Sequence, residues 1–67
     1  MRDPKRLDTF YDTLKEYHKE YVPDWRFGQL LYNFLYWLNR DPFYIEDDKM
    51  SDIFKEYFEN GKYEYKE

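Results

Sequence analysis

Two groups of residues in this sequence carry side chains that could do chemistry. His18 is the only histidine, and an imidazole can serve as a general base or as a metal ligand. The run Glu46-Asp47-Asp48, with Asp52 one helical turn later, supplies carboxylates of the kind that bind Mg²⁺ or Ca²⁺. Either chemistry needs further ligands or a second reactive group at a defined distance.

The sequence does not complete either kind of site. Cysteine is absent and there is no second histidine, so a zinc site lacks ligands. The acidic run has neither the spacing nor the glycine of a calcium-binding loop, and helix capping explains it as well. Ser51 has no adjacent base, and two glycines cannot build a phosphate-binding loop. We therefore predict no catalytic residue, no metal ligand, no cofactor and no enzymatic activity; a metal-binding or enzymatic protein using His18 with the helical carboxylates is the alternative.

The composition indicates one small globular domain. The chain has 67 residues, of which 9 are Tyr, 6 Phe and 2 Trp. Each buried aromatic ring removes about 150–250 Å² from water, so a small fold can form a core from few side chains. Disordered chains are poor in aromatic residues, which argues against disorder here.

The distribution of charge argues against two classes of partner. Residues 1–40 hold seven Lys or Arg and six Asp or Glu, whereas residues 41–67 hold four Lys and nine Asp or Glu. Nucleic acids and anionic membranes both require a basic face, so we expect neither. No apolar run approaches the ~20 residues of a membrane span, and no apolar signal segment follows the N-terminus. We expect a soluble, cytoplasmic protein.

Three segments show the periodicity of amphipathic helices. The first is expected over residues 4–20, with Asp3 as N-cap and Pro4 in the first turn, because apolar residues recur from Leu7 to Tyr21 at helical spacing. The second is expected over residues 25–39 after Asp24, and the third over residues 48–59 with Asp47 as N-cap. Residues 43–45 are expected to be extended. These segments predict an all-α fold, a small three-helix domain over residues 1–61 followed by a flexible tail, residues 62–67.

The second segment is apolar around most of its circumference, as expected of a central helix. One face of this segment is predicted to form part of the core. Gly28, near the start of the segment, is expected to permit a close approach by another backbone or ring. The core prediction contains the following residues: Leu7, Phe10, Leu14, Phe27, Leu31, Phe34, Leu38, Ile53, Phe54 and Tyr57.

A second face of the same helix carries an aromatic stripe, which is formed by Trp25, Gln29, Tyr32 and Tyr36. Trp and Tyr are favoured anchors at protein interfaces. The stripe therefore predicts an interaction site for a protein partner or for a second copy in a homodimer. The alternative is that this face packs inside the domain, as is common for a helix in a small helical unit. A small phage-type inhibitor that presents its acidic C-terminal half to a basic site is a further alternative.

Three stretches of the chain, in this order, resemble a family of short uncharacterised bacterial and phage-encoded proteins. The resemblance covers residues 2–58, and no activity is assigned to the family, so it implies a complete natural protein and no particular function. The stretches that carry it are Arg2-Asp3-Pro4-Lys5-Arg6, Pro23-Asp24-Trp25-Arg26-Phe27-Gly28-Gln29-Leu30-Leu31, and Asp41-Pro42-Phe43-Tyr44-Ile45-Glu46-Asp47-Asp48.

Overall fold

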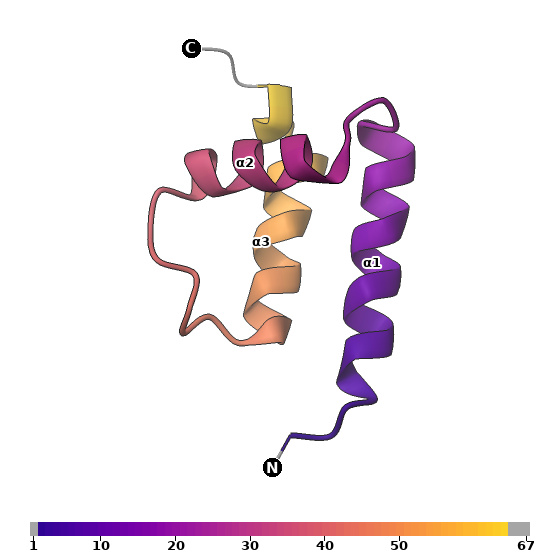
Figure 1. Cartoon of the computed structure of the whole chain (residues 1–67), viewed down its shortest axis with the longest axis vertical. Helices are drawn as coiled ribbons and strands as arrows, with labels where there is room; N and C mark the ends of the chain where they lie inside the picture. The colour runs from indigo at the N-terminus through magenta and orange to yellow at the C-terminus, as the bar shows by residue number, and fades with distance from the viewer. Residues whose placement is uncertain (1, 65–67) are drawn as a thin grey trace.

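Over the described residues, three α-helices and a short 3₁₀-helix make up the fold, which confirms the predicted small all-α three-helix domain. The computed structural model of the chain describes residues 2–64. The helices are α1 (Arg6–Tyr21), α2 (Phe27–Leu38) and α3 (Asp47–Glu59), followed by the 3₁₀-helix η1 (Lys62–Glu64). α1 and α3 run side by side in the same direction, and α2 lies across them in a second layer (Figure 1).

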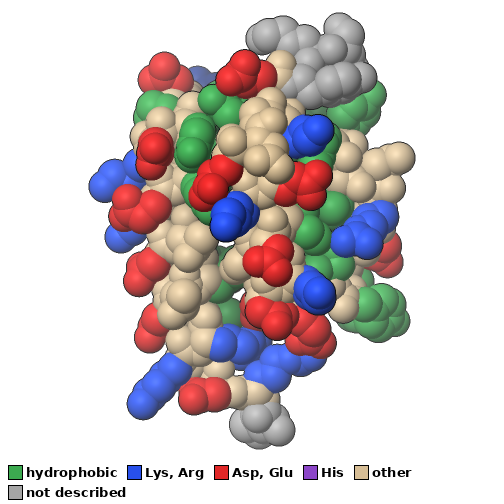
Figure 2. Space-filling view, turned by 180° about the vertical axis from the view of Figure 1, so that it is seen from behind, with side chains coloured by type: hydrophobic (Ala, Val, Ile, Leu, Met, Phe, Trp, Pro, Cys, Tyr) green, Lys and Arg blue, Asp and Glu red, His purple; other side chains and the backbone are tan. Residues whose placement is uncertain are grey.

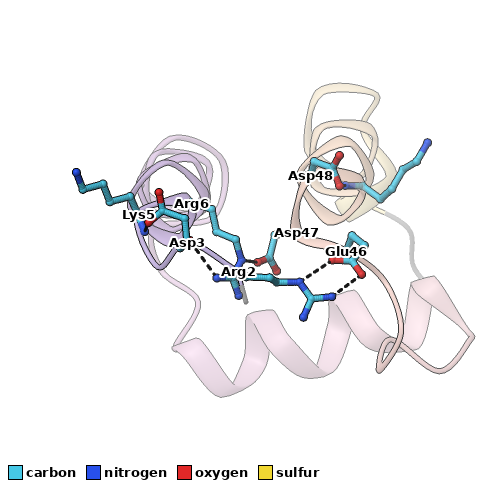
Figure 3. A network of polar contacts seen from close by, with 8 residues as sticks. Arg2, Asp3, Lys5, Arg6, Glu46, Asp47 and Asp48 are labelled. Atoms are coloured by element: carbon cyan, nitrogen blue, oxygen red, sulfur yellow. Dashed lines mark hydrogen bonds and ion pairs between the residues drawn. The ribbon is translucent and has the colours of Figure 1, made fainter.

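The parallel arrangement of α1 and α3 is held at both ends. At the start, Arg2 forms two hydrogen bonds with the Glu46 carboxylate, at 3.1 and 2.6 Å, and Arg6 Nε donates to Asp47 Oδ2 at 2.8 Å (Figure 3). At the other end, the Tyr17 hydroxyl donates to Glu59 at 2.7 Å. Burial and, next, the hydrogen bond to the Glu59 carboxylate raise the pKa of Tyr17 to about 12.

The role predicted for Asp47 is wrong in its detail. Glu46 occupies the N-cap position of α3 without a side-chain cap bond, and Asp47 is the first helical residue. The Asp47 carboxylate turns to Arg6 instead of the α3 backbone because the start of α1 lies beside it (Figure 3). The acidic first turn still suits the positive end of the α3 dipole.

The core forms where α2 crosses α3. The Phe34 and Phe54 rings stack with centroids 4.1 Å apart, and the Tyr57 ring meets Phe34 edge to face at 5.2 Å. α1 adds Tyr17 and Tyr21, whose rings stack on Phe58 at 5.4 and 5.6 Å. Among residues 2–64, the buried residues are Val22, Leu30, Phe34, Phe54, Tyr57 and Phe58.

The core prediction fails on one side of α2. Phe27 and Leu31 are 61% and 44% exposed, whereas Leu30 is 2% exposed. The buried face of α2 is therefore rotated toward Leu30, Phe34 and the half-buried Trp37. This rotation follows from the contact with α3, because a helix that is apolar nearly all round can bury several alternative faces. Val22, Leu30 and Phe58 were absent from the predicted core, and five of its members are only half-buried: Leu7, Phe10, Leu14, Leu38 and Ile53.

The connector between α2 and α3 is a turn and not the extended stretch that was predicted. The backbone N–H of Ile45 donates to the carbonyl of Pro42 at 3.1 Å, which closes a β-turn. After α3, the segment predicted as a flexible tail begins with η1, whose Tyr63 ring lies 5.5 Å from Tyr21 and 5.7 Å from Phe58. Residues 65–67 of that tail lie outside the described residues.

Candidate interaction surface

The aromatic stripe predicted on α2 lies on the side of the helix that faces away from the core. Tyr32 and Tyr36 are 70% and 53% exposed, and Gln29 is exposed as well. Trp25, which lies in the α1–α2 turn before the helix begins, is half-buried because it packs against the core. The stripe is therefore accessible along most of its length, and the expectation that this face packs inside the domain is not met.

Three members of the stripe line one shallow depression. Trp25, Gln29 and Tyr32 surround a volume of about 340 Å³ together with Gly28 and Asn33, while Tyr36 lies outside it. The Gln29 side-chain oxygen accepts the backbone N–H of Arg26 at 2.7 Å, so this residue also caps the start of α2.

The close approach expected at Gly28 is not found. A Cβ built at this position would meet no atom within 4 Å. The glycine therefore leaves the floor of the depression open rather than admitting a neighbouring backbone or ring.

A second feature, an apolar groove, lies on the other flank of α2 in the corner that α2 makes with α1 and α3. Its volume is about 260 Å³. The α1 side contributes Tyr11, which is 59% exposed, and the α2 side contributes the exposed Phe27 and Leu31. Within the described chain, no charged side chain lines the groove, whose complete lining is Phe10, Tyr11, Leu14, Phe27, Leu30, Leu31, Phe34, Leu35, Pro42, Met50 and Phe54.

Next to the groove, the connector turn exposes two aromatic rings, which we call the aromatic tip. Phe43 and Tyr44 are 78% and 83% exposed, and their rings meet edge to face with centroids 4.7 Å apart. Asp41 Oδ1 accepts the backbone N–H of Phe43 at 2.9 Å, a bond typical of an Asx-turn. Pro42, the residue before the tip, lines the groove.

His18 and three of the acidic residues considered for metal binding, Glu46, Asp47 and Asp48, form hydrogen bonds within the fold. His18 Nε2 donates to the carbonyl of Trp25 at 2.7 Å and so ties α1 to the turn that precedes α2. Glu46 and Asp47 face arginines, whereas Asp48 points away from them and accepts the N–H of Lys49 (Figure 3). Among residues 2–64, no group of three or more His, Cys, Asp or Glu side chains is placed to hold a metal ion.

Sequence reasoning located the stripe but missed the groove and the aromatic tip. Phe27 and Leu31 were assigned to the core because they share the periodicity of Phe34. The tip did leave a signal, because Asp-Pro commonly opens a turn, and aromatic residues directly after it are unusual.

Comparison with known proteins found no match to the chain among family models, curated proteins or solved structures. The resemblance to short bacterial and phage-encoded proteins therefore stays a prediction. Over residues 2–64, no helix is both long and apolar enough to cross a membrane.

Proposed function

We propose that this protein is a small protein-interaction module that binds a polypeptide partner, a second copy or another protein, through the apolar surface of α2. One observation carries the proposal: α2 has no charged residue, yet it leaves Phe27, Leu31, Tyr32 and Tyr36 between 44% and 70% exposed. Water penalises such a surface, and large exposed apolar patches on small domains commonly mark interaction sites. Aromatic side chains are also enriched at protein interfaces.

The proposed function involves no reaction, no cofactor, no nucleic acid and no membrane, and we place it in the cytoplasm. Support for this comes from the acidic net charge of −4 and from the absence of cysteine.

The inhibitor alternative, in which an acidic face binds a basic site, has less support. On the face formed by α1 and α3, lysine and arginine side chains are interspersed among the carboxylates (Figure 2). A face of mixed sign does not select a basic partner, because attraction and repulsion offset each other.

The test compares the wild-type chain with a double variant, Tyr32→Ser and Tyr36→Ser, and with a control variant, Asp12→Ser and Glu16→Ser on α1. Solution mass from low micromolar to near-millimolar concentration reports self-association, and cross-linking in the native host reports other partners. The proposal expects the α2 variant, or a second α2 variant at Phe27 and Leu31, to lose an association that the control keeps. A chain that is monomeric and whose cross-links are the same in every variant would refute it.

A further inference from the structure

In the isolated chain, the apolar groove is open to solvent. Its floor is formed by buried or half-buried rings such as Phe10 and Phe54, and its rim by the exposed Tyr11, Phe27 and Leu31. Leaving this concave, charge-free surface in water costs free energy that an apolar occupant would recover. A charged ligand would find no side chain of opposite sign in the lining, so the occupant must itself be apolar.

The two rings of the aromatic tip are also exposed to solvent in the isolated chain. Exposed turns usually carry Gly, Pro, Asn, Asp or Ser, which supply the backbone conformation and tolerate water. Here the corner of the β-turn carries Phe43 and Tyr44, at 78% and 83% exposed. The hydrogen bonds from Phe43 to Asp41 and from Ile45 to Pro42 hold the turn in place. The backbone of the tip is therefore pre-organised, which lowers the entropy lost when its rings bind.

Groove and tip are neighbours in one molecule, since Pro42 lines the groove and Phe43 follows it. Each copy thus presents a projecting ring and an apolar hollow side by side. A two-fold axis beside the connector would bring each tip to the groove of the other copy and form two identical contacts, which is the self-complementarity that a symmetric dimer requires.

We infer that the occupant of the groove is the Phe43 ring of a second copy of this chain, in a symmetric homodimer. This inference rests on the proposed function and names its partner. It also assigns the groove flank of α2, and not the stripe around Tyr32, to self-association.

Charge does not oppose this pairing. Each copy carries a net charge of −4, but the groove lining contains no charged residue. The carboxylates nearest in sequence after the tip, Glu46 and Asp47, are paired with Arg2 and Arg6. Apart from the Asp41 carboxylate, which accepts the N–H of Phe43, repulsion between two copies is spread over surface charges away from the groove, and physiological salt screens charges more than about 8 Å apart.

The available area predicts a weak dimer. Tyr11, Phe27, Phe43 and Tyr44 are 59–83% exposed, which at ~150–250 Å² for a whole aromatic side chain amounts to on the order of 500 Å² per copy. Stable specific interfaces bury about 800 Å² per partner, so the interface belongs with the smaller, transient ones. The dimer should therefore form at high micromolar rather than nanomolar concentration.

The test uses two complementary variants of the full chain. Leu31→Glu places a charge on the groove rim but leaves the tip intact, and Phe43→Ser removes the ring but leaves the groove intact. Both positions are exposed, so both variants should keep the wild-type circular dichroism spectrum. Glu16→Ser, at an exposed position of α1 outside both the groove and the stripe, is the matched control. Sedimentation equilibrium up to near-millimolar concentration measures the dissociation constant against the monomer mass of 8.7 kDa.

We expect each variant alone to weaken the dimer about ten-fold or more, because both tip-to-groove contacts are lost in its homodimer. The Glu16→Ser control should dimerise like the wild type. An equimolar mixture of Leu31→Glu and Phe43→Ser can form one intact contact, the ring of the first in the groove of the second. The mixed dimer should therefore be tighter than either variant homodimer and weaker than the wild type.

Three results would overturn the inference. A wild-type chain that stays monomeric at near-millimolar concentration excludes the second copy, while the proposed function is still judged by the cross-linking of other partners. A dimer that is lost on stripe substitution but survives Leu31→Glu and Phe43→Ser places self-association on the stripe and leaves the proposed function standing. A mixture that dimerises no better than its components excludes reciprocal insertion.

Discussion

Replacing Leu30 by alanine should cost far more stability than the same replacement at its neighbour Leu31. Leu30 is 2% exposed and Leu31 is 44% exposed, although the helical pattern predicted Leu31 in the core. The substitution removes three carbon atoms, which at ~0.8 kcal/mol each amounts to about 2.4 kcal/mol when they are fully buried. The cavity left at Leu30 raises the expected loss to about 3–5 kcal/mol. The Leu31 side chain is exposed and lines the groove, so about 1 kcal/mol is expected there.

Urea denaturation followed by circular dichroism measures both losses, with the midpoint compared at equal slope. A domain of this size has a net stability of only ~3–5 kcal/mol, so Leu30→Ala could unfold completely. Leu30→Val, which removes one carbon and should cost about 1 kcal/mol, keeps the comparison measurable. Low protein concentration excludes any contribution of self-association at Leu31. Equal losses for the two alanine variants, or a larger loss at Leu31, would show that α2 buries the other face.

Four further predictions each concern one residue or one added ion. Gly28→Ala should raise the free energy of unfolding by about 0.5–1 kcal/mol, because a helical glycine with open space at its Cβ position gains rigidity at no steric cost; thermal melting would show an unchanged or lower midpoint if that space were filled. Asp47→Ala should cost about 0.5–1 kcal/mol and less at high salt, because its partner Arg6 lies at the surface; a salt-independent loss would contradict the ion-pair role. The pKa of Tyr17 is about 12 in the fold against an ordinary value of 10.0, so the unfolded chain releases this proton first and the free energy of unfolding should fall as pH rises from 10 to 12. Denaturation at several pH values should give a shallower fall for Tyr17→Phe, and an identical slope would argue against the raised pKa. Millimolar Mg²⁺ or Ca²⁺ should leave the melting temperature unchanged, since Glu46 and Asp47 already face arginines, and a clear upward shift would favour a cation site.

The candidate surface was only partly predictable, and the stripe shows why. Tyr32 and Tyr36 could be assigned to one helical face from their spacing, and that face is exposed. Whether that face is exposed depends on how many helices pack around α2. The spacing of residues within α2 carries no information on that number. The groove needed three elements to meet, because Tyr11, Leu31 and Met50 come from α1, α2 and α3. The tip depended on a turn that leaves Phe43 exposed, where the alternation of residues predicted a short extended stretch.

Local pattern by itself determined the helices of this protein. The spacing of apolar residues, the proline at residue 23 and the Asn60-Gly61 stop place α1, α2 and α3 to within about two residues of their observed bounds, because helix formation and termination depend on neighbours along the chain. Only the tertiary structure decided which residues these helices bury. α2 is apolar nearly all round, so its own sequence allows several rotations of similar energy. The stacking of Phe34 on Phe54 selected the one that buries Leu30 and leaves Leu31 on the rim of a groove.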